Sequence, residues 1–234
     1  MKKLILSLIF SIPYFVFSQS GFSYKIIGFS KDGLISYVTF RESQNLESGG
    51  PGDYEFFVYD LKSDKTLYLE GSPILDRDAV LEESFIINDY KKILSSYDII
   101  INNEYKVINT YFIENCEYLN SELTIGDKYD IDIYTDIIHD IYHECYWGEL
   151  NHYILSSTTH IFLNSYNLVP GMRKYLGKLQ SHDCDGPYYY LGYYKSPFEN
   201  RIALLFISYR NEEGEMGDTY IEFVGANLNP STFK

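Results

Sequence analysis

The order of apolar and polar residues along the chain predicts mostly β-structure. Aromatic and branched side chains recur at every second position, or in short runs, in segments bounded by turn residues. The Asp32-Gly33 pair supplies the positive φ of a tight hairpin between the first two such segments. Residues 24–70 are therefore expected to form a blade-like antiparallel meander, with strands at 24–29, 34–40, 54–61 and 66–69.

One segment has helical spacing instead. Between residues 78 and 97, apolar side chains recur three or four positions apart, with acidic residues early and lysines late, as the helix dipole favours. We expect the main helix of the chain at about 78–97.

The closing part of the chain repeats the layout of its opening. Strands are expected at 188–194 and 220–225, and the run Arg201–Tyr209 is apolar enough to be buried on both faces. Residues 210–218 are expected to form an acidic loop. Residues 188–228 thus form a second blade-like module.

The middle region, residues 98–187, is less regular. At 129–134, apolar residues alternate with aspartates, which is typical of a strand with one face in water. Residues 137–147 fit either period, and residues 169–180 are expected to form a loop or a short basic helix. The predicted fold class is mainly β (α+β), with antiparallel blade-like meanders and one main helix.

Composition agrees with this fold class and argues against some classes of binding partner. The chain of 234 residues has 25 Tyr and 15 Phe, and its formal net charge is −14. Aromatic residues suit a half-buried pleated surface. Because phosphate binding needs a cationic face, nucleic acid and anionic membrane surfaces are not expected as partners.

The N-terminus is typical of a secretory signal. Lys2 and Lys3 precede an apolar stretch, and cleavage is expected after Ser18, with Ser20 as the close alternative. Residues 1–18 are the predicted signal peptide. Residues 19–234 are then a single secreted or periplasmic β-rich domain, with no membrane insertion after cleavage.

Three cysteines follow the signal. In an oxidising compartment two of them can pair and one is left over, and the sequence leaves all three choices open. They are Cys116, Cys145 and Cys184.

The densest run of potential metal ligands is residues 139–145. His139 and His143 fall on one face of either a helix or a strand. Zinc proteases require Glu directly after the first histidine, where this chain has Asp140, so that class is excluded. A metal site is therefore a hypothesis beside simple surface hydrogen bonding, and no cofactor is expected. The third ligand would be Cys145, His152, His160 or Asp183.

Two acidic clusters are candidates for calcium. Neither has the spacing of a calcium-binding loop with its distal Glu, and solvated strand faces explain them with fewer assumptions. They are Asp127, Asp130, Asp132, Asp136 and Asp140, and Asp183 with Asp185.

Aromatic residues are the candidate binding groups. Tyr146, Trp147 and Tyr189 lie in tyrosine-rich runs whose rings can stack on sugar rings or on a protein partner. Cross-strand packing is the competing explanation. The sequence has no nucleophile elbow, phosphate loop or dinucleotide fingerprint. A pair of facing carboxylates, as in glycosidases, is compatible with so acidic a chain.

Three segments together resemble a family of uncharacterised, predicted secreted bacterial proteins. The hairpin Gly28-Phe29-Ser30-Lys31-Asp32-Gly33 is similar to the family's Gly-Phe-Ser-x-Asp-Gly, and to the blade turns of TolB-like and WD-repeat propellers. Residues 94–99 resemble the family's Leu-x-x-Tyr-Gly-Ile, with Asp98 in place of the glycine. Residues 214–224 resemble its glycine-rich loop and final strand, and Cys184 is placed like a family cysteine. The resemblance implies location and architecture, and carries over no catalytic residue.

These patterns together predict an exported, non-enzymatic binding or structural module of the bacterial envelope or periplasm, with a protein or glycan partner. The alternative is a metal-dependent or carboxylate-based hydrolase with its site in the middle region.

Overall fold

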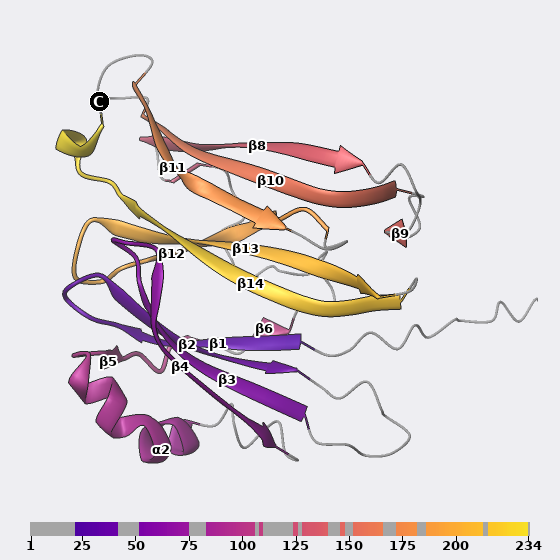
Figure 1. Ribbon diagram of the computed structural model, residues 1–234. Helices are drawn as coiled ribbons and strands as arrows, with labels where there is room; N and C mark the ends of the chain where they lie inside the picture. Colours follow the sequence, from indigo (N-terminus) through magenta and orange to yellow (C-terminus); the bar gives the residue numbers. More distant parts are fainter. Residues whose placement is uncertain are drawn as a thin grey trace, which may run out of the picture.

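Three antiparallel β-sheets and one α-helix make up the part of the chain that the computed structural model describes (Figure 1). The layers stack in the order helix, first sheet, middle sheet and outer sheet, and apolar side chains fill the interfaces between them. The mainly β fold with one main helix is confirmed. The described residues are 22–41, 52–74, 83–105, 108–109, 124–125, 128–139, 146–147, 152–165, 172–181, 186–212 and 215–233.

The first sheet is the opening meander. Its strands lie in the order β4-β3-β2-β1, and the short β5 and β6 pair with β1. Gly33, at φ +85°, makes the β1–β2 turn that the Asp-Gly pair predicts. The strands are β1 (Phe22–Phe29), β2 (Leu34–Arg41), β3 (Gly52–Asp60), β4 (Lys65–Ile74), β5 (Ile100–Ile101) and β6 (Ile108–Asn109).

Helix α2 (Glu83–Ser96) covers the face of the first sheet that points away from the other sheets (Figure 1). Its buried residues Tyr90 and Leu94 pack against that face, and the Tyr90 ring stacks on Phe56 with centroids 3.9 Å apart. The predicted helix is therefore confirmed from residue 83 onward. Residues 78–82 lie outside the described part.

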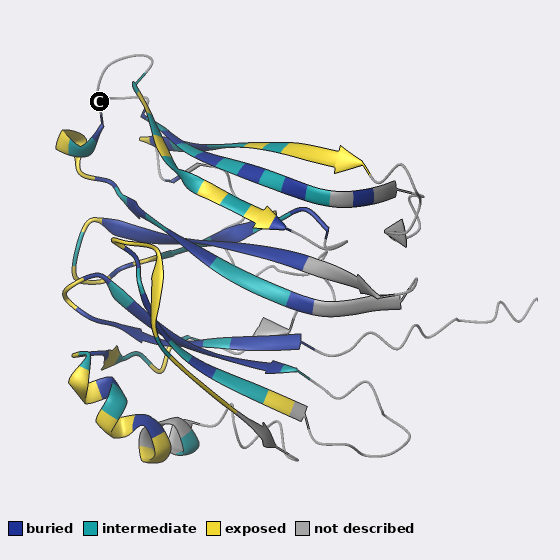
Figure 2. Ribbon diagram, viewed as in Figure 1, coloured by how far each residue is buried: buried dark blue, intermediate teal, exposed yellow. Residues whose placement is uncertain are grey.

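The middle sheet, β12-β13-β14, is covered on both faces. Every residue from Arg201 to Ser208 is buried (Figure 2). Leu205 packs into the core shared with the first sheet and Leu204 into the core shared with the outer sheet, so the predicted two-sided burial is confirmed. The elements are β12 (Tyr189–Lys195), β13 (Arg201–Glu212), β14 (Glu215–Asn227) and the 3-10 helix η2 (Pro230–Thr232).

One face of the outer sheet packs against the middle sheet, and the opposite face, here named the wet face, is exposed to solvent. Ile131, Ile161 and Leu163 point into the core against the middle sheet, whereas alternate residues face solvent, which gives the striped burial in Figure 2. The wet-faced strand predicted at 129–134 is confirmed and continues to His139. In the order β11-β10-β8-β7, with β9 beside β10, the strands are β7 (Thr124–Ile125), β8 (Tyr129–His139), β9 (Tyr146–Trp147), β10 (His152–Ser165) and β11 (Met172–Ser181).

Two of the sequence predictions are wrong. Residues 172–180 are not a loop or helix but lie in β11. The consecutive residues Ile161 and Phe162 of β10 pair with Gly177 and Tyr175, so Leu176 between them is an extra residue in β11. Such a bulge breaks the period of two and mimics helical spacing. The loop predicted at 210–218 is also wrong for its described residues, since 210–212 belong to β13 and 215–218 to β14.

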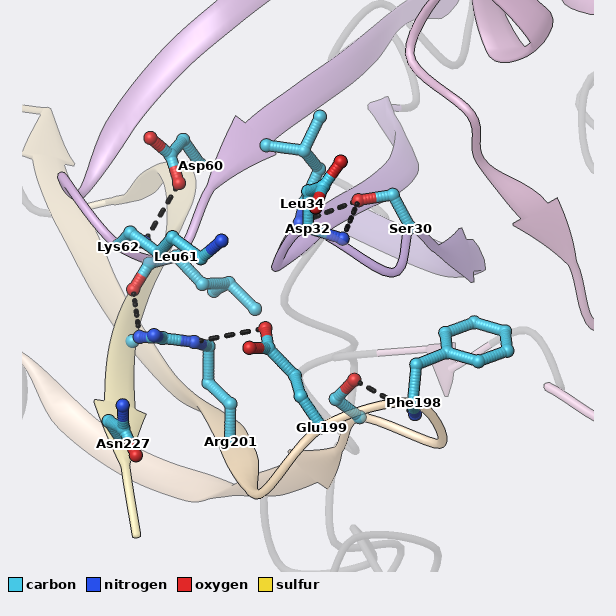
Figure 3. A network of polar contacts seen from close by, with 12 residues as sticks. Ser30, Asp32, Leu34, Asp60, Leu61, Lys62, Phe198, Glu199, Arg201 and Asn227 are labelled. Carbon is cyan, nitrogen blue, oxygen red and sulfur yellow. Dashed lines mark hydrogen bonds and ion pairs between the residues drawn. The ribbon is translucent and has the colours of Figure 1, made fainter. Parts of the chain in front are cut away.

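A polar network joins turns of the first sheet to the middle sheet (Figure 3). The buried Arg201 donates from Nη1 to the Leu61 carbonyl at 3.1 Å and from Nε to Glu199 Oε1 at 3.1 Å. Beside it, Ser30 Oγ accepts two backbone N–H groups of the β1–β2 turn. Gly225 lies so close that a Cβ there would be 1.8 Å from the Leu61 oxygen. The turns are thus fixed against one another.

Candidate functional site

The wet face of the outer sheet carries a cluster of rings. The register of the three adjacent strands β8, β10 and β11 puts His160 opposite Tyr134 and Phe162 opposite Tyr175. Because the alternate residues of β10 enter the core, His160 and Phe162 must point outward. The cluster, here named the outer aromatic face, consists of Tyr134, His160, Phe162 and Tyr175.

Neighbouring rings of the cluster are offset or tilted relative to one another. The Tyr134 and His160 centroids are 6.4 Å apart with planes at 27°, and the His160 and Tyr175 centroids are 6.1 Å apart at 38°. The Phe162 and Tyr175 centroids are 5.1 Å apart with planes at 54°, and such offset or tilted pairs leave part of each ring face uncovered. Tyr134 is 59% exposed and Tyr175 is 49% exposed, so both offer open ring surface to solvent.

An ion pair frames one side of the outer aromatic face. The Arg173 guanidinium lies 3.6 Å from the centroid of Phe162 and donates a hydrogen bond to the Asp132 carboxylate. The carboxylate and the ring together fix the orientation of the guanidinium, whose remaining N–H groups are donors.

A second polar group frames the other side. The Asp136 carboxylate lies 3.5 Å from His160 Nε2, and it accepts a hydrogen bond from Tyr134, which raises the pKa of the Tyr134 hydroxyl. On the opposite side of the imidazole, His160 Nδ1 and the Tyr175 hydroxyl lie 3.4 Å apart. Tyr134, His160 and Tyr175 are therefore linked through polar contacts that include the Asp136 carboxylate.

This arrangement is suited to binding by stacking and hydrogen bonding. Open ring surfaces attract apolar or C–H faces, and oriented polar groups beside them confer specificity. Within the described residues, no group of three or more His, Cys, Asp or Glu side chains is placed to hold a metal ion.

The predicted metal ligands are only partly described. His139 is exposed at the end of β8, opposite Ile154 of β10. His160 lies further along β10, opposite Tyr134, so the two histidines do not converge. His143, Cys145 and Asp183 lie outside the described residues, and of His152 only the backbone, in β10, is described.

The described members of the first acidic cluster follow the wet face of β8. Asp132 pairs with Arg173 and Asp136 with His160, while Asp130 lies opposite Asn164. These three carboxylates lie on a solvated strand face, as the explanation without calcium predicts. The remaining members, Asp127, Asp140, Asp183 and Asp185, lie outside the described residues.

The predicted binding aromatics lie away from the cluster. Tyr146 and Trp147 form β9, whose backbone pairs with β10 at Tyr153 and His152. Tyr189 is exposed on β12 of the middle sheet, and partial burial raises the pKa of its hydroxyl. The candidate disulfide cysteines Cys116, Cys145 and Cys184 all lie outside the described residues, so their pairing stays a prediction.

Sequence reasoning missed the outer aromatic face. The sequence shows the alternation around Tyr134 and the ligand-type residue His160, but it predicts a loop or a short helix at Tyr175. The signal that could have found the cluster is a strand assignment for 172–181, because Tyr175 then becomes a cross-strand neighbour of Phe162.

Comparison of the chain with protein-family models, with curated proteins and with solved structures finds no match. Helix α2 has neither the length nor the apolar character to cross a membrane, and the described residues contain no other helix that does.

Proposed function

We propose that this chain is an exported, non-enzymatic binding module of the bacterial envelope, and that the outer aromatic face holds its partner. The observation that carries the proposal is the exposure of Tyr134 and Tyr175 in a cluster framed by oriented charges. Clustered exposed aromatic surface is typical of interaction sites, whereas single exposed apolar residues are ordinary.

Export is the second part of the proposal. It is supported by the signal-like pattern of Met1–Ser20 and by the resemblance of 28–33, 94–99 and 214–224 to secreted bacterial proteins. The blade-like meanders of the first and middle sheets agree with the β-rich architecture that this resemblance implies.

Retention of envelope material by the purified, immobilised protein tests the binding surface. Protein and hexose retained from a bacterial envelope extract are measured for the wild type and for the double variant Tyr134→Ala/Tyr175→Ala. We expect the double variant to lose most of the retained material, because it removes both open rings. The variant Phe198→Ala, which removes an exposed ring from the β12–β13 turn (Figure 3), is the matched control and should retain as much as the wild type.

Equal retention by the wild type and the double variant would contradict the proposal, as would the absence of any retained material. Far-UV circular dichroism of each variant establishes that the sheets are intact.

A further inference from the structure

The geometry points to a neutral glycan chain as the ligand of the outer aromatic face, with sugar rings stacked on Tyr134 and Tyr175. This inference rests on the proposed function, because it names the partner of the same surface.

The spacing of the two tyrosines requires a ligand with more than one stackable unit. Tyr134 lies on β8 and Tyr175 on β11, with β10 between them. Because neighbouring strands are about 4.8 Å apart, β8 and β11 are separated by roughly 10 Å. The His160 ring lies between the two tyrosine rings and contacts both. A chain of rings that crosses the strands meets all three side chains in turn.

The outer aromatic face offers partners for both the C–H groups and the hydroxyl groups of a sugar. The C–H groups of a pyranose ring carry partial positive charge, which the negative face of an aromatic ring attracts. Its hydroxyl groups need donors and acceptors at the rim, which Arg173, Asp132 and Asp136 supply. These rim groups are already held by the Arg173–Asp132 ion pair and by the contacts of Asp136, so little freedom is lost when a ligand binds.

The charges select a neutral ligand. Arg173 and Asp132 compensate each other, and Lys178, opposite His160 on β11, balances the Asp136 carboxylate. The face therefore has no local positive excess to attract an acidic polysaccharide or a phosphate-bearing ligand, and the chain as a whole is strongly acidic and would repel one. A hydroxyl group, by contrast, donates readily to a carboxylate.

A protein partner fits this face less well. Stable protein interfaces bury about 800 Å² on each partner and are depleted of Asp, Glu and Lys. Here two carboxylates and a lysine lie beside the rings, since Asp132 pairs with Arg173, Asp136 contacts His160 and Lys178 lies opposite His160.

Affinity electrophoresis of the purified protein tests the inference. Native gels contain one of four neutral polysaccharides: hydroxyethylcellulose, laminarin, galactomannan or dextran. A gel with polygalacturonate tests an anionic chain. We expect at least one neutral polysaccharide to retard the protein and polygalacturonate to have no effect.

Variants of Tyr134 and Tyr175 test whether the polysaccharide binds at the outer aromatic face. Tyr134→Ala and Tyr175→Ala should each weaken the association constant about tenfold, because each removes one stacking surface. Tyr134→Phe keeps the ring and should stay within about threefold of the wild type, and Phe198→Ala should bind like the wild type.

Three results would overturn the inference: no retardation by any of the four neutral polysaccharides, stronger retardation by polygalacturonate, or binding that both alanine variants retain. If one of these occurs while retention of envelope protein still depends on Tyr134 and Tyr175, the glycan assignment is wrong and the proposed function stands. If that retention is also independent of both tyrosines, both proposals fail.

Discussion

At the scale of single residues, burial decides which charged groups stabilise the fold. Arg201 is 8% exposed and donates hydrogen bonds to both the Leu61 carbonyl and the Glu199 carboxylate. The side chain of Arg173 is 47% exposed, and its partner Asp132 is similarly open. Removing one member of a buried pair leaves groups without partners, whereas an exposed pair gives up little when it is broken.

We therefore expect Arg201→Met to lower the free energy of unfolding by about 2–4 kcal/mol, because Glu199 and the Leu61 carbonyl lose their partner. Arg173→Met should lower it by less than about 1 kcal/mol. Urea unfolding measures both values. Similar losses for the two variants would show that the Arg201 network does not join the sheets as described.

Glu222 of β14 gives a pH-dependent prediction. Burial raises the pKa of its carboxyl above the usual value of 4.5, so the folded state holds the proton more tightly than the unfolded state. The resulting stability is present below the unfolded pKa and is lost as pH rises through the folded pKa. Glu222→Gln should therefore be more stable than the wild type at pH 7, and this advantage should shrink on acidification to about pH 4. Urea unfolding across this range would contradict the assignment if the advantage stayed constant or grew on acidification.

At the scale of elements, the end of helix α2 is specified by backbone geometry. Ile99 N–H donates to the Leu94 carbonyl and Asp98 N–H to the Ser95 carbonyl, which is a Schellman motif. Asp98 occupies its left-handed position with φ +52°, where glycine is favoured.

Asp98→Gly should raise the free energy of unfolding by about 0.5–1 kcal/mol, because it removes the strain of a side chain at positive φ. Asp64 is the matched control, since its φ is +50° but its Oδ1 accepts the Gly225 N–H at 2.8 Å. Asp64→Gly loses that hydrogen bond and should bring no gain. Chemical denaturation of both variants checks the pair, and a loss of stability in Asp98→Gly would contradict the prediction.

Elements could be predicted from the sequence where local pattern and fold agree. The Asp32-Gly33 hairpin and the doubly buried β13 are examples, because turn chemistry and a continuous apolar run are local signals. Strand β11 could not be predicted, because its extra residue Leu176 disrupts the alternation. The outer aromatic face was missed for a related reason: it is assembled by register between three strands, and register depends on tertiary pairing.

At the scale of the whole molecule, the middle sheet joins the layers. Its strand β13 contributes Leu205 to one core and Leu204 to the other. Because neither core is complete without this strand, the three sheets should unfold together.

Leu204→Ala and Leu205→Ala should each lower the free energy of unfolding by about 2–5 kcal/mol, as for other large-to-small changes in cores. Both variants should keep a single transition. Fluorescence of Trp147, the one tryptophan of the chain, reports on the outer sheet, and far-UV circular dichroism reports on all layers. Separate midpoints from the two signals would show that the sheets unfold independently.

The central claim is that the outer aromatic face is the binding surface, and hydroxyl-radical footprinting tests it at the residues themselves. The purified protein is oxidised with and without a bacterial envelope extract, and modification is measured at each aromatic residue. Tyr134 and Tyr175 should be protected by the extract, while Phe198 and Tyr189, exposed elsewhere, should be oxidised to the same extent in both samples. Unchanged oxidation of Tyr134 and Tyr175, together with protection at another surface, would contradict the account.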